Sequence, residues 1–289
     1  MNHTTLLARA AAAALATLLF STPAQAQNQQ LWSSYINQCI TAKDNANWQD
    51  AGTFCDAAMA EAQKFGSNST QASDTHNVFG NFFRDLGKYA DAEDHFLRAL
   101  RIREQYNCSN CLELVAETQG NLAGLYVFQG RYNEAETMAR KAIGIKEQLF
   151  GSQHPKVANE LNQLALAYKG QGRWAEAEST YLRCIAINEA KAPSSRDLAD
   201  NYNNLSNLYS DEKSDRFNLT QAVNYGEKAL EIYRAILPAN HPTLAISYNN
   251  LGTKYIQLTQ FDKALGLLEQ GYAIRKANLP GTHPDYGQS

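Results

Sequence analysis

The sequence lacks every short motif that would mark a familiar catalytic or nucleotide-binding centre. It contains no G-x-x-x-x-G-K-[ST], no G-x-G-x-x-G after a strand pattern, no G-x-S-x-G and no H-E-x-x-H. Its six histidines are scattered, and three of them stand directly before a proline. We therefore expect a protein that is not an enzyme and has no catalytic residue, no cofactor and no metal centre.

The chain also lacks an excess of basic charge. It has 26 Lys and Arg against 29 Asp and Glu, which gives a formal net charge of −3. A protein that binds the phosphate backbone of a nucleic acid usually shows a basic face or a high isoelectric point. The bulk charge therefore predicts no nucleic-acid partner.

Long hydrophobic runs are missing beyond the N-terminus, so we expect no membrane span in the mature chain. Residues 1–26 contain Arg9, an apolar stretch from Ala10 to Phe20, and a small-x-small ending at residues 24–26. This pattern is typical of a secretory signal peptide cleaved after Ala26; the alternative is a buried alanine-rich helix. The Ala-x-Ala ending is typical of bacteria and predicts a periplasmic or secreted protein.

The rest of the chain is built from a repeated block. Clear copies start at Gly87, Gly130 and Gly172, a looser copy at Thr259 and a weaker one at Asn47. A small residue returns at intervals of 43, 42, 45 and 42 residues, as Ala92, Ala135, Ala177, Ala222 and Ala264. Such a period is the signature of a repeat architecture.

Each repeat reads as two helices. Leu161, Leu164 and Tyr168 form one apolar stripe of a helix, and a second stripe follows from Ala177. Gly172 lies between them, where a helix end favours a residue that tolerates positive φ. One such hairpin cannot bury both of its apolar faces, so successive hairpins must stack into a solenoid.

The pattern of a small residue, Tyr, Ala and an aromatic residue resembles the tetratricopeptide repeat, as at Gly252, Tyr255 and Ala264. The period near 42, the NNL-x-x-x-Y segments from Asn203 and Asn249, and the His-Pro boundaries resemble the kinesin-light-chain variety. The resemblance implies an all-α, right-handed superhelical solenoid of about six antiparallel helix pairs. We predict a signal peptide at 1–26, the solenoid at 27–282 and the start of a truncated repeat at 283–289.

The resemblance further implies that the first helix of each pair lines a concave groove where a protein or peptide binds. Recurrent amides occupy the inward positions: Asn77, Asn81, Asn121, Asn162, Asn203, Asn204, Asn207, Asn249 and Asn250. An amide offers both a donor and an acceptor to the backbone of an extended peptide. The alternative is that these amides only bridge neighbouring helices. The charges are mixed, with Arg84 and Lys169 among several acids, so we predict no basic clamp and a poor fit to a strongly acidic tail.

The five cysteines permit two disulfides, because export makes them permissible. Cys108 and Cys111 form a C-x-x-C pair without a strand pattern, which favours a structural loop-closing disulfide over thiol–disulfide exchange. Cys39 and Cys55 lie on opposing helices of the first hairpin and are predicted to bond. Cys184 occupies a tightly packed position and is predicted to be a buried free thiol.

The chain ends as a further repeat begins, with Gly281-Thr-His-Pro-Asp-Tyr-Gly-Gln-Ser289 and no polar capping helix. Two interpretations stay open. The protein is an exported adaptor whose last hairpin is covered by a partner or by self-association, or it is the recognition arm of a longer protein. Exported bacterial repeats that resemble these often precede a caspase-like peptidase domain, an analogy that no residue here supports.

Overall fold

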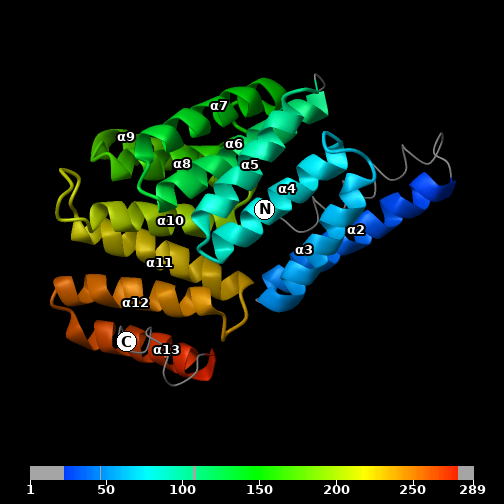
Figure 1. Cartoon of the computed structure of the whole chain (residues 1–289). Coiled ribbons are helices and arrows are strands. Elements are labelled where there is room, and N and C mark those ends of the chain that lie inside the picture. Colours follow the sequence, from blue (N-terminus) through cyan, green and yellow to red (C-terminus); the bar gives the residue numbers. More distant parts are fainter. Residues whose placement is uncertain (1–22, 46, 107–108, 279–289) are drawn as a thin grey trace. The chain divides into compact units, whose positions relative to one another are not determined.

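The computed structural model describes residues 23–45, 47–106 and 109–278, and these form twelve helices and no strand (Figure 1). The predicted all-α fold is confirmed. Most of the predicted signal peptide, the truncated repeat at 283–289 and Cys108 lie outside the described residues. None of the described helices is long and apolar enough to cross a bilayer.

The helices fall into two units, which are described separately. Unit 1 runs up to Gln129 and unit 2 starts at Gly130. The helices of unit 1 are α2 (Pro23–Asp44), α3 (Trp48–Gln63), α4 (Thr70–Asp85), α5 (Tyr89–Arg103) and α6 (Ser109–Phe128). Those of unit 2 are α7 (Tyr132–Phe150), α8 (Pro155–Gly170), α9 (Trp174–Lys191), α10 (Arg196–Tyr209), α11 (Leu219–Ile236), α12 (Pro242–Gln257) and α13 (Phe261–Asn278). The predicted domain bounds, with a single solenoid at 27–282, stay a prediction.

Histidine, proline and glycine residues at the repeat boundaries set where the helices begin and end. His154 and His241 are N-caps, and their Nδ1 atoms accept from the backbone N–H groups of Lys156 and Thr243 at 3.2 and 3.1 Å. The proline after each histidine takes the first helical position, where its missing N–H is not needed. Gly172, between α8 and α9, has φ +73°, as its predicted role requires.

One predicted boundary is wrong. We predicted that the Cys108/Cys111 pair lies in a loop between helices, at the boundary where other repeats of this chain have His-Pro. Instead, α6 already begins at Ser109 and includes Cys111. A proline disfavours helical backbone in the residue before it, which fixes where α8 and α12 begin. No proline stands at this position, so the helix extends further toward its N-terminus.

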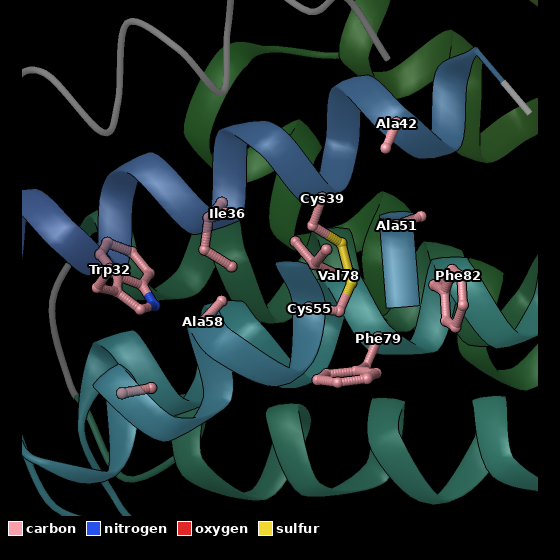
Figure 2. Packing of buried hydrophobic residues seen from close by; sticks show 11 residues of the cluster. Trp32, Ile36, Cys39, Ala42, Ala51, Cys55, Ala58, Val78, Phe79 and Phe82 are labelled. Atoms are coloured by element: carbon pink, nitrogen blue, oxygen red, sulfur yellow. A yellow bond between two sulfur atoms is a disulfide. The ribbon is translucent and has the colours of Figure 1, made fainter. Parts of the chain in front are cut away.

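Unit 1 has its core around the first two hairpins (Figure 2). Trp32 and Ile36 of α2 pack with Phe79 and Phe82 of α4, and all four are at least nine-tenths buried. Alanines of α3, such as Ala58, are fully buried in the same cluster and let the helices approach closely. The Trp32 indole Nε1 donates to the Thr75 hydroxyl at 2.8 Å, so the one polar atom of this side chain is satisfied.

Unit 2 packs small residues against leucine and tyrosine. Ala165, Ala177 and Cys184 have no exposed surface, as expected of small residues where α8 and α9 pack closely. Tyr181 fills the space beside them and is also fully buried. A Cβ atom on Gly252 of α12 would lie 2.8 Å from a Leu268 side-chain carbon of α13, so this contact also requires the small residue.

Candidate functional site

The candidate site is the set of amides on the first helix of each pair. These helices are α4 and α6 in unit 1, and α8, α10 and α12 in unit 2. Because every first helix carries its amides at related positions of the repeat, the amides of neighbouring first helices can come within hydrogen-bonding distance. The structure shows which of them do so.

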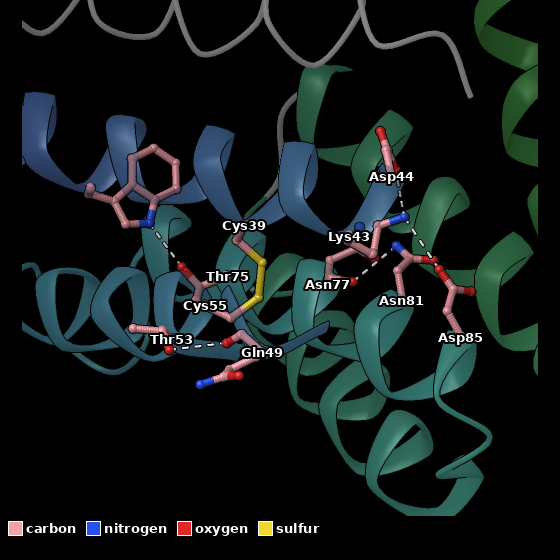
Figure 3. The surroundings of a disulfide bond; sticks show 11 residues. Cys39, Lys43, Asp44, Gln49, Thr53, Cys55, Thr75, Asn77, Asn81 and Asp85 are labelled. Carbon is pink, nitrogen blue, oxygen red and sulfur yellow. Dashed lines mark hydrogen bonds and ion pairs between the residues drawn. A yellow bond between two sulfur atoms is a disulfide. The ribbon is translucent and has the colours of Figure 1, made fainter. Parts of the chain in front are cut away.

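In unit 1 all three predicted amides are engaged. Asn121 of α6 donates to the Asn77 side chain of α4 at 3.0 Å, and Asn77 donates to Glu117 at 3.4 Å. Asn81 donates to the Asn77 backbone carbonyl at 3.1 Å (Figure 3). Asn77 itself is 4% exposed. Asn77 and Asn121 therefore connect α4 to α6, as the bridging alternative predicted, whereas Asn81 bonds only within α4.

The charges beside these amides are also paired. Lys43 of α2 lies 2.9 Å from Asp44 and 3.3 Å from Asp85, the pairs drawn in Figure 3. Arg84 adds a contact of 2.8 Å to Asp85. Arg103, which is 3% exposed, pairs with Asp74 at 2.7 Å and also donates to Thr118 and to the Leu114 carbonyl. Each of these cations therefore has a carboxylate partner within unit 1.

In unit 2 some of the amides bridge helices in the same way. Asn162 of α8 accepts from Asn204 and Asn201 of α10, at 3.0 and 3.1 Å. Asn201 also accepts from Asn188 of α9 at 2.8 Å, so this cluster joins three helices. Asn207 of α10 accepts from the Lys254 ammonium of α12 at 2.8 Å. Like the amides of unit 1, these residues hold neighbouring helices together.

Three amides of unit 2 have no such partner. The side chains of Asn203 on α10 and of Asn249 and Asn250 on α12 make no hydrogen bond with another described residue, and all three residues are half-buried. A polar side chain that is partly exposed and unpaired can accept or donate to a ligand without first breaking an internal bond. Of the nine predicted groove residues, these three have both the C=O and the NH2 group of the side chain free of hydrogen bonds to described residues.

A pair of lysines stands next to Asn207. Lys254 of α12 is 4% exposed, and burial lowers its pKa to about 8, with repulsion from Lys169 of α8 as the second cause. Lys169 donates to the Asn207 carbonyl at 3.5 Å, and burial lowers its pKa too, although Asp211 acts in the opposite direction. Within the described part of the chain, neither ammonium has a carboxylate at ion-pair distance.

The sequence analysis missed Lys254. Only Arg84 and Lys169 were predicted as cations of the groove. The signal that could have revealed Lys254 is its place one residue before Tyr255, where the apolar stripe continues. A lysine at the edge of such a stripe buries its aliphatic stem. This face of unit 2 therefore carries more positive charge than the sequence analysis assigned.

Comparison with known proteins decides the family. The model of the tetratricopeptide repeat matches residues 33–105, 114–190 and 197–277, which is most of the chain. The chain belongs to the tetratricopeptide repeat family. No curated protein matches its sequence significantly.

Solved structures share the fold of this tetratricopeptide repeat chain at low sequence identity. BtubC (BKLC) from P. vanneervenii is 21% identical, with a TM-score of 0.60 over 91% of this chain and 95% of its own. A putative kinesin light chain with nearly identical TPR-like repeats from Podosopora anserina is 22% identical, with a TM-score of 0.56 over 73% and 99%. A Rap protein complexed with competence and sporulation factor is 14% identical, with a TM-score of 0.67 over 89% and 67%. The predicted kinesin-light-chain-like repeat is confirmed as a fold.

The cysteines of the tetratricopeptide repeat chain are mostly disulfide-bonded, and Cys184 donates to the side-chain oxygen of Asn201 at 3.1 Å. A disulfide joins Cys39 of α2 to Cys55 of α3, with Cα atoms 5.2 Å apart (Figure 3). Cys111 is disulfide-bonded, and its predicted partner Cys108 lies outside the described residues. Cys184 is a buried free thiol, and burial raises its pKa, which disfavours the reactive thiolate.

Proposed function

We propose that the chain is an exported, non-catalytic scaffold that binds an extended peptide or protein segment across α10 and α12 of unit 2. The observation that carries the proposal is the set of unpaired amides at Asn203, Asn249 and Asn250. An extended peptide presents alternating N–H and C=O groups, and an amide side chain can pair with either of them. A row of amides therefore binds backbone without demanding one particular side chain.

The family supports the coarser part of this proposal, because tetratricopeptide repeats typically act by protein–protein contact. One protein of similar fold is described in complex with a competence and sporulation factor, which is a statement about that protein alone. For this chain, the unpaired amides of unit 2 are the reason that we propose α10 and α12 as the peptide-binding helices.

The test compares two sets of asparagine substitutions. Peptides that bind the intact protein are selected from a displayed random library, and their affinities are measured for each variant. The triple variant Asn203→Ala, Asn249→Ala, Asn250→Ala should bind at least about 10-fold more weakly, since each lost hydrogen bond is worth about 1 kcal/mol. Its melting temperature should not change, because these amides hold no other helix.

The control variant is Asn162→Ala with Asn204→Ala, which removes an internal bridge between α8 and α10. It should melt at a lower temperature, because Asn201 loses its acceptor there, and it should keep most of its peptide affinity. Equal binding by the triple variant and the wild type would reject the proposed site. The same holds if only the control variant loses affinity.

Export is a separate part of the proposal, and it is supported by the signal pattern in residues 1–26. The intact mass of the protein isolated from the periplasm or the medium of its source should correspond to a chain that starts at Gln27. A mass that includes the first 26 residues, or recovery only from the cytoplasm, would contradict export. A much larger mass would favour the alternative of a recognition arm in a longer protein.

Self-association through the last hairpin is supported by an exposed apolar stripe on α13. Phe261, Leu265 and Tyr272 are 63%, 59% and 41% exposed. On α11, the residues that correspond to Leu265 and Tyr272 are Val223 and Leu230, and these are only 8% and 4% exposed. Sedimentation velocity over a range of concentrations should show a dimer, and Leu265→Glu should remove it; a monomer at all concentrations would contradict this part of the proposal.

A further inference from the structure

Two histidines of unit 1 face each other across a helix pair. His76 lies on α4 and His95 on α5, and their Nδ1 atoms are 3.0 Å apart. The ring centroids are 5.1 Å apart, only about 2 Å more than the nitrogens, so each ring points its Nδ1 along the line to the other. Such a contact requires one ring to donate a proton to the lone pair of the other.

The surroundings of the two rings are mostly aromatic. Phe79 stacks on His95 with centroids 4.9 Å apart, and Phe83 lies 5.3 Å from the same ring. Burial is the main cause that lowers the pKa of both histidines, that of His76 to about 4. The charged groups that act on the pair are Asp91, Asp94 and Arg98, all on α5. At neutral pH both imidazoles are therefore uncharged, which is the form that binds metals.

The number of ligands limits which metal fits. Nowhere in the described ranges do three His, Cys, Asp or Glu side chains converge. Structural zinc sites use four protein ligands and catalytic zinc sites three. A monovalent d10 cation such as Cu(I) or Ag(I) is stable with two nitrogen ligands in line, and imidazole is a good ligand for copper.

We propose that His76 and His95 form a two-coordinate, linear site for Cu(I), in which the metal replaces the shared proton between the two Nδ1 atoms. Metal–nitrogen bonds are about 2 Å long, so the two nitrogens must separate from 3.0 Å to about 4 Å. Small rotations of the two side chains supply this movement, because neither ring makes a further hydrogen bond to a described residue. The rings already point at each other, so the direction of both lone pairs needs little change.

The protons balance in this exchange. Before binding, one ring carries its proton on Nδ1 and the other on Nε2. Binding through both Nδ1 atoms requires the first ring to move its proton to Nε2, through solvent. No proton is released overall, no electron is transferred, and the site gains the single positive charge of the ion.

The experiment uses Ag(I) as a redox-inert probe of the intact protein, in a buffer free of halide and thiol. Calorimetric titration and native mass spectrometry should show one ion per wild-type chain. The variants His76→Asn and His95→Asn should each bind at least about 100-fold more weakly, as expected when a metal site loses an essential group. Asn keeps a polar group that can hydrogen-bond the remaining imidazole, and circular dichroism checks that each variant is folded.

Two controls separate this site from other soft ligands. His241→Asn removes a lone histidine that caps α12, and Cys184→Ala removes a buried free thiol. Both variants should bind Ag(I) with the affinity of the wild type. Imidazole 15N spectra of the wild type should show both Nδ1 atoms change on binding. The proposal is overturned if the wild type binds no ion, if the His76 and His95 variants retain the affinity, or if Cys184→Ala abolishes it.

Discussion

In unit 1 every predicted amide bonds to a described neighbour, whereas in unit 2 three of the six do not. The cations beside these amides differ too: Lys43 and Arg103 of unit 1 pair with carboxylates, but Lys169 and Lys254 of unit 2 donate to asparagine oxygens. The satisfied polar groups hold neighbouring helices together, and we propose that the unsatisfied ones bind a ligand.

The cores of the two units differ as well. Both pack fully buried alanines, but unit 1 sets them against Trp32, Phe79 and Phe82 beside a disulfide, and unit 2 against Leu164 and Tyr181. Large aromatic side chains bury much area per residue, and in this cluster Trp32 of α2 packs with Phe79 and Phe82 of α4. The covalent link between α2 and α3 adds to the stability that this cluster gives.

The largest effect should come from removing that link. Cys39 and Cys55 are separated by 16 residues, and closing a loop of this size stabilises a fold by about 3 kcal/mol. Cys39→Ala with Cys55→Ala should therefore make the amides of α2 and α3 exchange their hydrogens much faster, while α8 to α13 should exchange at wild-type rates. Hydrogen exchange read by mass spectrometry measures both regions at once. Equal loss of protection in both units would break the proposed difference between them.

Lys254, which is buried in unit 2 without a carboxylate partner among the described residues, should reduce stability at neutral pH. Its pKa is lowered from 10.5 to about 8 in the folded chain, so the unfolded chain binds more protons between these values and stability rises with pH across that window. Lys254→Met removes the charge but keeps the length, and should raise the stability at pH 7 by about 1–3 kcal/mol. The gain should shrink between pH 7 and pH 9, which urea unfolding at each pH would show.

The same experiment separates the cost of burying the Lys254 charge from the benefit of its hydrogen bond to Asn207. Since unfolded tyrosines begin to ionise near pH 10, the comparison stays below that pH. If Lys254→Met destabilises unit 2 at every pH, the bond from Lys254 to Asn207 matters more than the cost of burying the charge. The lysine would then belong with the amides that hold helices together.

Much of this arrangement could be predicted from the sequence, because the repeat fixes its own helices. The period of the small residues places the hairpins, and His154-Pro155 and Gly172 mark helix ends. The extra length of α6 could not be predicted, because the helix start there has no proline to define it.

The state of each amide could not be predicted either. Asn203 and Asn204 are neighbours in an NNL segment, yet only Asn204 reaches Asn162. Consecutive residues on a helix point about 100° apart, so which amide meets the next helix depends on how the two helices are rotated against each other. The His76–His95 contact has the same origin, since 19 residues and a turn separate the two rings. A pattern of residue types predicts a face, but not the pairs that form on it.

A smaller effect concerns the turn before α13. Gly87, Gly130 and Gly172 adopt positive φ between the helices of their pairs, and Thr259 takes this place in the last pair with φ +58°. A β-branched residue in left-handed backbone is strained by about 1–2 kcal/mol. Thr259→Gly should therefore raise the melting temperature of unit 2, and Thr259→Ala should give less of the gain. No change with either variant would show that the turn relaxes at no cost.

The smallest expected effect tests whether unit 2 is loosely or closely packed. Gly144 lies inside α7, and a Cβ atom there would meet nothing within 4 Å. Gly226 in α11 would place its Cβ atom 3.1 Å from Leu251 and 3.2 Å from Ser206. Alanine in an open helical position stabilises by about 0.5–1 kcal/mol relative to glycine, so Gly144→Ala should raise the melting temperature slightly. Gly226→Ala should lower the melting temperature, because the Leu251 side chain must move. A higher melting temperature for Gly226→Ala would instead mean that α11 and α12 are less closely packed than the structure shows.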